Sequence, residues 1–297
     1  MGRQQLPQRT RVILSRFGLG VVLAGLLLLT CAGTRSEAAD KIAGLLSIQD
    51  VVTLPNHPVR IEARLTAAGQ ADTRPLGGVL LHLRIDGKDS ATATTNEAGQ
   101  VSFDHLPKMR GTNILSLSVD PSASVSAETR EATLCVWERR RPIVLVELES
   151  LMQALPSVTP SATTGGDAKP LAEPVPEAAD ELSRLTQYYY NVVYVPGEAL
   201  ASSGANTGHT LRQWLEVHKF PPGFVAVLGA GGLSAIVERF KQEGWTTMKS
   251  GIGRTRSFAD TLLSHRMEVV VVPELPKGEH PRKAKGAHDW KEVRKKL

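Results

Sequence analysis

The first part of the chain alternates between apolar and polar residues with a period of two. This alternation runs through residues 59–65 and 79–85 and is typical of strands with one buried face. The turn signal Asp86-Gly87 follows the second of these runs. Short strands with turns roughly every 8–12 residues predict an all-β immunoglobulin-like sandwich over residues 40–140.

From residue 141 onward, continuous apolar runs alternate with amphipathic helical patterns. Apolar runs of this kind are typical of strands buried on both faces, so the pattern predicts a Rossmann-like α/β domain with a parallel sheet between two layers of helices. The expected strands are 142–147, 191–195, 223–228 and 268–273, with a short strand and a turn within 245–253, and the expected helices are 181–189, 210–218, 233–243 and 258–263.

Two segments of this second domain, residues 141–297, differ in composition from the rest. Residues 153–178 are rich in proline, serine and glycine, and they form a linker-like insert directly after the first strand. Residues 277–297 hold eight basic and three acidic residues. This basic tail is either a solvated chain end or a contact with anionic lipid or an envelope polymer.

Residues 1–38 have the composition of an export signal peptide. Arginines precede an apolar run at 17–32, and Ser36-Glu37-Ala38 offers small residues for cleavage. An uncleaved anchor and lipidation of Cys31 are the alternatives. The chain is therefore expected to be exported, and to be periplasmic, secreted or anchored in the envelope membrane.

The signal segment also accounts for most of the net charge of +5. It holds five arginines and one glutamate, which leaves 30 basic and 29 acidic residues in the remainder. The charge is therefore no indication of nucleic acid as a partner. Removal of the signal leaves Cys135 alone, which excludes an intramolecular disulfide, and we expect Cys135 to be buried in a strand.

Two carboxylates mark the end of the first apolar strand of the α/β domain. Glu147 and Glu149 follow the run 142–146. The carboxyl ends of parallel strands are where open α/β sheets bind their ligands, so these side chains are the first candidates for a site. Simple exposure to solvent at the strand end is the alternative.

The segments around these carboxylates occur in an order that resembles the haloacid-dehalogenase-like (HAD-like) phosphohydrolase superfamily. The similarity is greatest to its branch of lipin-type and actin-patch phosphatidate phosphatases. The landmarks are Pro142 to Leu151, Val192 to Gly197, Thr210 to Leu215 followed by Phe220 to Leu228, Gly251 to Arg254, and Ala287 to Val293. The resemblance covers about 155 residues and implies a magnesium-dependent phosphohydrolase ancestry.

At each catalytic position of that family this chain carries another residue. Glu147 and Glu149 stand in place of the nucleophilic and the proton-donating aspartates, and Pro196 replaces a hydroxyl residue. Arg254 stands where the family has an acidic magnesium ligand, and a guanidinium cannot bind a cation. The resemblance therefore implies a pseudoenzyme with no metal or other cofactor, in which we expect Arg254 to form a salt bridge with Glu147 or Glu149.

The first domain has its own, shorter resemblance. Residues 77–83 and 94–103 are similar to a strand, turn and strand of bacterial immunoglobulin-like domains of surface proteins. Such domains are usually spacers or binding modules.

Three further features have weaker functional interpretations. The glycine-rich segment 229–234 is either a dinucleotide-binding fingerprint or a flexible turn. Lys241 and Lys249 are candidates for the lysine of the phosphohydrolase family. Tyr188-Tyr189-Tyr190 is either a helix end that packs on the sheet or a surface on which a ligand stacks.

Taken together, these patterns favour an exported binding or scaffold protein with a catalytically inactive HAD-like domain. The alternative is a residual phosphohydrolase, in which Mg²⁺ would assist hydrolysis of a phosphate ester or phospholipid. The ligand and the partners stay open, and no nucleic acid is expected.

Overall fold

The computed structural model describes residues 41–69, 74–154, 172–202 and 208–297. The proposed signal peptide with Cys31, and residues 155–171 of the proline-rich insert, lie outside the described residues. None of the helices in the described ranges is long and apolar enough to cross a lipid bilayer.

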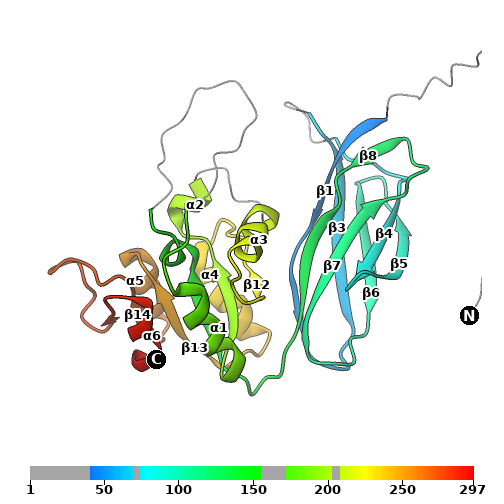
Figure 1. Ribbon diagram of the computed structural model, residues 1–297. Coiled ribbons are helices and arrows are strands. Elements are labelled where there is room, and N and C mark those ends of the chain that lie inside the picture. The colour runs from blue at the N-terminus through cyan, green and yellow to red at the C-terminus, as the bar shows by residue number, and fades with distance from the viewer. Residues whose placement is uncertain (1–40, 70–73, 155–171, 203–207) are drawn as a thin grey trace, which may run out of the picture. The chain divides into compact units, whose positions relative to one another are not determined.

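The first domain is a β-sandwich of two sheets, as the period-two pattern predicted (Figure 1). The four-stranded sheet has the order β6-β3-β1-β8, and the five-stranded sheet has the order β2-β9-β7-β4-β5. The strands are β1 (Ile42–Ile48), β2 (Val51–Thr53), β3 (Val59–Ala67), β4 (Leu80–Ile85), β5 (Lys88–Thr94), β6 (Gln100–His105), β7 (Gly111–Val119), β8 (Val125–Ala127) and β9 (Arg130–Val136).

The second domain contains a six-stranded sheet in which each neighbouring pair is parallel. Its order, β12-β11-β10-β13-β14-β15, is that of a doubly wound sheet, because the chain runs outward in one direction from β10 and then in the other from β13. The strands are β10 (Ile143–Glu147), β11 (Asn191–Val195), β12 (Phe224–Val225), β13 (Met248–Gly253), β14 (Glu268–Val271) and β15 (Lys285–Gly286).

Helices cover both faces of this sheet, as the continuous apolar strands predicted. One buried cluster joins α1, α3 and α6 to one face, and a second joins α4 and α5 to the other. The helices are α1 (Ala178–Tyr188), α2 (Glu198–Ser202), α3 (Gly208–Val217), α4 (Gly232–Gln242), α5 (Arg256–Ser264) and α6 (Trp290–Lys296), with a short 3-10 helix η1 (Leu148–Leu151) after β10.

The structure corrects the expected extent of two segments. The strand predicted over 223–228 is only β12, because this edge strand pairs with β11 through Phe224 and Val225 alone. The tail 277–297 is not simply a solvated end. Trp290 and Val293 are buried on the sheet, and the indole N–H of Trp290 donates to the Ser150 carbonyl at 3.1 Å.

Strand β9 belongs to the cores of both domains. Leu134 and Val136 face the sandwich interior, whereas Cys135 and Trp137 pack with the residues under α4 and α5. Cys135 is fully buried, as predicted. A strand that is covered on both faces explains why this segment is almost continuously apolar.

Polar contacts join the same regions. The carboxylate of Asp50, between β1 and β2, accepts the backbone N–H groups of Thr133 and Val225, each at 2.7 Å. It also pairs with the Arg212 guanidinium of α3, which in turn donates to the Glu131 carbonyl at 2.6 Å. Asp50 therefore ties the sandwich to an edge strand and a helix of the α/β domain.

Candidate functional site

Glu147 lies at the carboxyl end of β10, at the point where the strand order of the parallel sheet reverses. Its side chain is buried, with 1% of the residue exposed. Oε2 accepts the backbone N–H groups of Arg254 at 2.6 Å and Thr255 at 2.9 Å, and Oε1 accepts the Thr255 hydroxyl. The carboxylate therefore fills the crevice in which doubly wound sheets usually bind their ligands.

Glu149 lies on η1 and is also buried, with no exposed surface. Its carboxylate accepts the backbone N–H groups of Gly197 at 2.7 Å and Leu200 at 3.1 Å. These two donors belong to the loop after β11 and to α2, whereas the donors to Glu147 follow β13. The two carboxylates thus bind different loops on either side of β10, and simple exposure to solvent is wrong for both.

Burial governs the electrostatics of both groups. It raises the pKa of Glu147 to about 7, although the hydroxyl and N–H of Thr255 and the N–H of Arg254 offset part of the rise. Burial also raises the pKa of Glu149, and the N–H groups of Leu200 and Gly197 again act in the opposite direction. Hydrogen-bond donors rather than a cation stabilise these carboxylates.

The salt bridge expected for Arg254 is wrong. Its backbone N–H binds Glu147, but its guanidinium donates to the carbonyl oxygens of Met152 at 2.9 Å and Gln153 at 3.4 Å. The carboxylate does not need the guanidinium, because backbone and hydroxyl donors already occupy both of its oxygens. Arg254 instead binds the segment that follows η1.

Pro196 is buried directly after β11, so it lies beside the carboxylate site but offers no donor to it. The following residue, Gly197, supplies the N–H instead. A Cβ at Gly197 would lie 2.6 Å from Oε1 of Glu149, so only glycine allows the loop to come this close. Neither Glu149 partner was predicted from the sequence.

Thr255 is the residue of this site that the sequence reasoning missed. It is the N-cap of α5, and its hydroxyl accepts the Phe258 N–H at 3.2 Å while it also donates to Glu147. A threonine just before a helical pattern is the available signal. Close packing accounts for Gly251 and Gly253. A Cβ at Gly251 would lie 2.2 Å from the Leu262 side chain, and a Cβ at Gly253 would lie 2.2 Å from the Phe258 side chain.

The residues present do not fit a magnesium site. Mg²⁺ requires several oxygen ligands in octahedral geometry, but both oxygens of Glu147 already accept N–H or O–H groups. Arg254 stands where the resemblance to the phosphohydrolases would place a third acidic residue, and a guanidinium cannot bind a cation. Within the described residues, no group of three or more His, Cys, Asp or Glu side chains could hold a metal ion.

Neither lysine candidate completes a phosphohydrolase site. Lys241 lies on α4, where its Nζ is 3.7 Å from Oε1 of Glu238. Lys249 is exposed on β13. The three tyrosines do not simply pack on the sheet, since Tyr188 and Tyr189 are 69% and 63% exposed.

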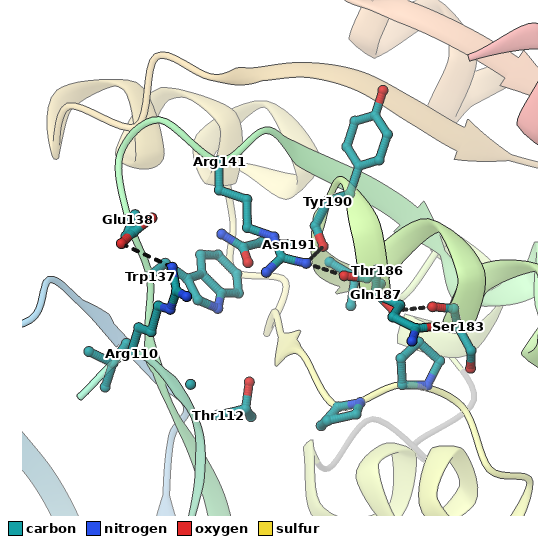
Figure 2. Close-up of a pocket in the computed structure, with 15 residues that line it drawn as sticks. Arg110, Thr112, Trp137, Glu138, Arg141, Ser183, Thr186, Gln187, Tyr190 and Asn191 are labelled. Carbon is teal, nitrogen blue, oxygen red and sulfur yellow. Dashed lines mark hydrogen bonds and ion pairs between the residues drawn. The ribbon is translucent and has the colours of Figure 1, made fainter.

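A cavity of about 410 Å³ lies at the opposite, amino end of the parallel sheet, where β10 and β11 begin (Figure 2). The guanidinium of Arg141 donates through Nη2 to the carbonyl oxygens of Thr186 and, at 3.2 Å, Tyr190. Within the described residues, Nε of Arg141 and Nδ2 of Asn191 are buried without a hydrogen-bond partner. Trp137 and Arg110 also line this cavity.

The cavity has room for a small ligand. Its volume falls in the range of about 300–1,000 Å³ that is typical of small-molecule sites. Arg141 and Asn191 line it, but their unpaired Nε and Nδ2 atoms are themselves buried.

Comparison with known proteins gives similarities to solved structures only. No family model and no curated protein matches the chain. The solution structure of the CARDB domain of PF1109 from Pyrococcus furiosus is 13% identical over 33% of this chain and 96% of that chain, with a TM-score of 0.24. The crystal structure of that domain in complex with di-metal ions is 15% identical over 31% of this chain and 86% of that chain, with a TM-score of 0.23. The fibronectin(III)-like modules of Clostridium thermocellum CbhA are 14% identical over 32% of this chain and 47% of that chain, with a TM-score of 0.23.

Proposed function

We propose that this protein is an exported binding or scaffold protein whose α/β domain is HAD-like but has lost phosphohydrolase activity. The carboxyl edge of the parallel sheet, where such an enzyme would react, serves to hold loops together. The alternative, a residual phosphohydrolase on a phosphate ester or phospholipid, is the less favoured function.

One observation carries this proposal: both candidate carboxylates are buried and occupied by hydrogen-bond donors. A nucleophilic carboxylate must present a free oxygen to phosphorus. Each oxygen of Glu147 and Glu149 instead accepts at least one hydrogen bond from the protein. A reaction there would first have to break the contacts that hold the loops after β11 and β13.

The fold supports the ancestry and the binding role in different ways. The strand order of the parallel sheet is that of a doubly wound domain, and this order is compatible with the proposed HAD-like relationship. The cavity at the amino end of the sheet offers space for a small ligand. Exposed basic residues of the tail, among them Lys277, Arg282 and Lys283, offer a surface for an anionic partner.

The catalytic part of the proposal can be tested with purified protein, Mg²⁺, and either p-nitrophenyl phosphate or vesicles that contain phosphatidate. We expect the wild-type protein to release no more phosphate than the Glu147→Gln variant, because the wild-type carboxylate is not free to attack. Mg²⁺-dependent release that Glu147→Gln or Glu149→Gln abolishes, while the exposed variant Glu97→Gln retains it, would establish the phosphohydrolase instead.

The binding part needs a separate measurement. We expect the protein to sediment with vesicles of anionic phospholipid, to release them as salt is raised, and to bind less when Lys277, Arg282 and Lys283 are changed to Gln. Equal sedimentation with neutral and anionic vesicles would contradict an anionic partner for this tail.

A further inference from the structure

Three side chains outside the carboxylate site form a cluster where α4 and α5 pack together. Oγ of Ser234 lies 2.7 Å from Nε2 of His265. Nδ1 of the same ring lies 3.1 Å from Oε1 of Glu238. Ser234 and Glu238 are one turn apart on α4, and His265 is the C-cap of α5.

These contacts have the connectivity of an activated nucleophile. A hydroxyl lies within hydrogen-bond distance of one nitrogen of an imidazole, and a carboxylate lies beside the other nitrogen. In the tautomer with a proton on Nδ1, Nε2 can accept the Ser234 proton, and the protonated Nδ1 faces the Glu238 carboxylate. The residues also follow the chain order serine, acid, histidine found in α/β-hydrolases.

A second charged group faces the ring from α4. Nζ of Lys241 lies 3.3 Å from Nδ1 of His265 and 3.7 Å from Oε1 of Glu238. An ammonium can donate only to an Nδ1 that carries no proton, so Lys241 favours the tautomer that cannot take the Ser234 proton. Glu238 and Lys241 therefore favour different tautomers of the His265 ring.

The backbone around Ser234 suits a nucleophile. A loop over residues 226–231, with Gly229 and Gly231, leads from β12 into α4, and Ser234 is the third residue of that helix. The order strand, loop, helix is that of the nucleophile elbow of hydrolases. Gly232, two residues before Ser234, has a φ of 56°, which favours glycine, although Ile236 stands where that elbow has its second glycine. A glycine-rich loop before a nucleophile is thus a third interpretation of this segment, beside the dinucleotide fingerprint and the flexible turn.

The start of α4 also offers donors for a developing oxyanion. Its N-cap, Gly231, provides no side-chain cap. A helix leaves its first N–H groups without intrahelical partners, and these include those of Leu233 and Ser234. N–H groups of this kind stabilise the negative oxygen that forms during acyl transfer.

We propose that Ser234 is a nucleophile that accepts acyl groups from small esters, with His265 as the base and Glu238 as the residue that positions it. Ser234 Oγ attacks the ester carbonyl while its proton passes to His265 Nε2, and the leaving alcohol departs with that proton. Water then attacks the acyl-serine through the same base, which releases the carboxylic acid and restores the hydroxyl. Ser234 is exposed, so unhindered esters can reach it.

This inference does not rest on the proposed function, because Ser234, Glu238 and His265 take no part in the hydrogen bonds described for Glu147 and Glu149. If the phosphate-release experiment contradicts the proposed function, the role proposed for Ser234 is unaffected. If Ser234 proves unreactive, the proposed binding role is unaffected.

The test is covalent labelling of the full chain with a fluorophosphonate probe, with the modified residue located by peptide mass spectrometry, and hydrolysis of p-nitrophenyl acetate as a second readout. We expect labelling at Ser234 that Ser234→Ala abolishes and His265→Gln slows by about a hundredfold, since a positioned base contributes rate factors of roughly that size or more. Ser264→Ala is the matched control: Ser264 is exposed beside His265 but bonds only the Thr261 carbonyl among its described contacts.

Substitutions of Glu238 and Lys241 are expected to change the rate of labelling in opposite directions. Glu238→Gln is expected to slow labelling about tenfold, because the ring loses the carboxylate that positions it. Lys241→Met is expected to speed labelling. Two outcomes would overturn the proposal. One is that Ser234 is labelled no faster than Ser264. The other is that His265→Gln is labelled at the wild-type rate with an unchanged melting temperature, in which case the cluster only joins two helices.

Discussion

At the scale of single residues, Glu147 shows how burial and hydrogen bonds act in opposite directions on a carboxylate at a strand end. The group is buried at a strand end, and two N–H groups and a hydroxyl satisfy it. Burial favours the neutral form, whereas these donors favour the ionised form, and burial prevails because the pKa is raised to about 7. The stability of the fold should therefore depend on pH through this residue.

We predict that Glu147 makes the free energy of unfolding fall as the pH rises from about 4.5 to about 7. In this range the folded protein binds more protons than the unfolded chain, so stability is present below the unfolded pKa and is lost as the pH rises through the folded one. The loss is on the order of 1–3 kcal/mol. Urea denaturation at pH 5 and pH 8 measures it.

Glu147→Gln should remove most of this difference, because an amide can accept the two N–H groups and does not ionise. The exposed variant Glu97→Gln should keep the wild-type dependence. An unchanged pH dependence in Glu147→Gln would mean that other groups govern it.

At the scale of elements, the approach of α5 to β13 depends on two glycines. A Cβ at Gly251 or Gly253 would come within 2.2 Å of Leu262 or Phe258. The Gly-x-Gly pattern resembled part of a catalytic motif, but here it lets a helix pack closely on a strand. The same approach brings Thr255, at the start of α5, to the carboxylate of Glu147.

We predict that Gly253→Ala destabilises the protein by about 1–3 kcal/mol, since the added methyl group forces Phe258 and α5 away from the sheet. Thermal denaturation followed by circular dichroism would show it. Gly229→Ala is the control, because no atom lies within 4 Å of the position its Cβ would take. Equal melting temperatures for the two variants would contradict the packing argument.

At the scale of the whole molecule, Asp50 and Arg212 link the sandwich to the α/β domain. The Asp50 side chain is fully buried and that of Arg212 is 16% exposed, so solvent screens the pair little. Trp137 and Cys135 extend the α/β core into the last strand of the sandwich. The two domains should therefore unfold together.

We predict that Asp50→Ala costs about 3–5 kcal/mol, because it leaves Arg212 and the N–H groups of Thr133 and Val225 without their shared acceptor. Calorimetry should show one transition for the wild type and two for the variant. Asp89→Asn is the control, since its ion pair with Arg84 is exposed and such pairs contribute little. A single, unshifted transition in Asp50→Ala would rule out this link.

The sequence by itself determined the elements. The change from period two to continuous apolar runs, which reflects burial on one or on both faces, separated a sandwich from a parallel sheet and placed most strands and helices within a few residues. Cys135 was correctly predicted as buried for the same reason. The sequence also marked Glu147 and Glu149 as the side chains at a strand end, where sites are built.

Only the tertiary structure decided what those side chains do. Hydrogen bonds from Arg254, Thr255, Gly197 and Leu200 join residues about 50 to 108 positions apart in the chain, and no local pattern encodes such contacts. The Ser234, Glu238 and His265 cluster was invisible for the same reason, because it exists only where α4 meets α5. Periodicity reports which face of an element is buried, whereas chemistry depends on which distant residue that face meets.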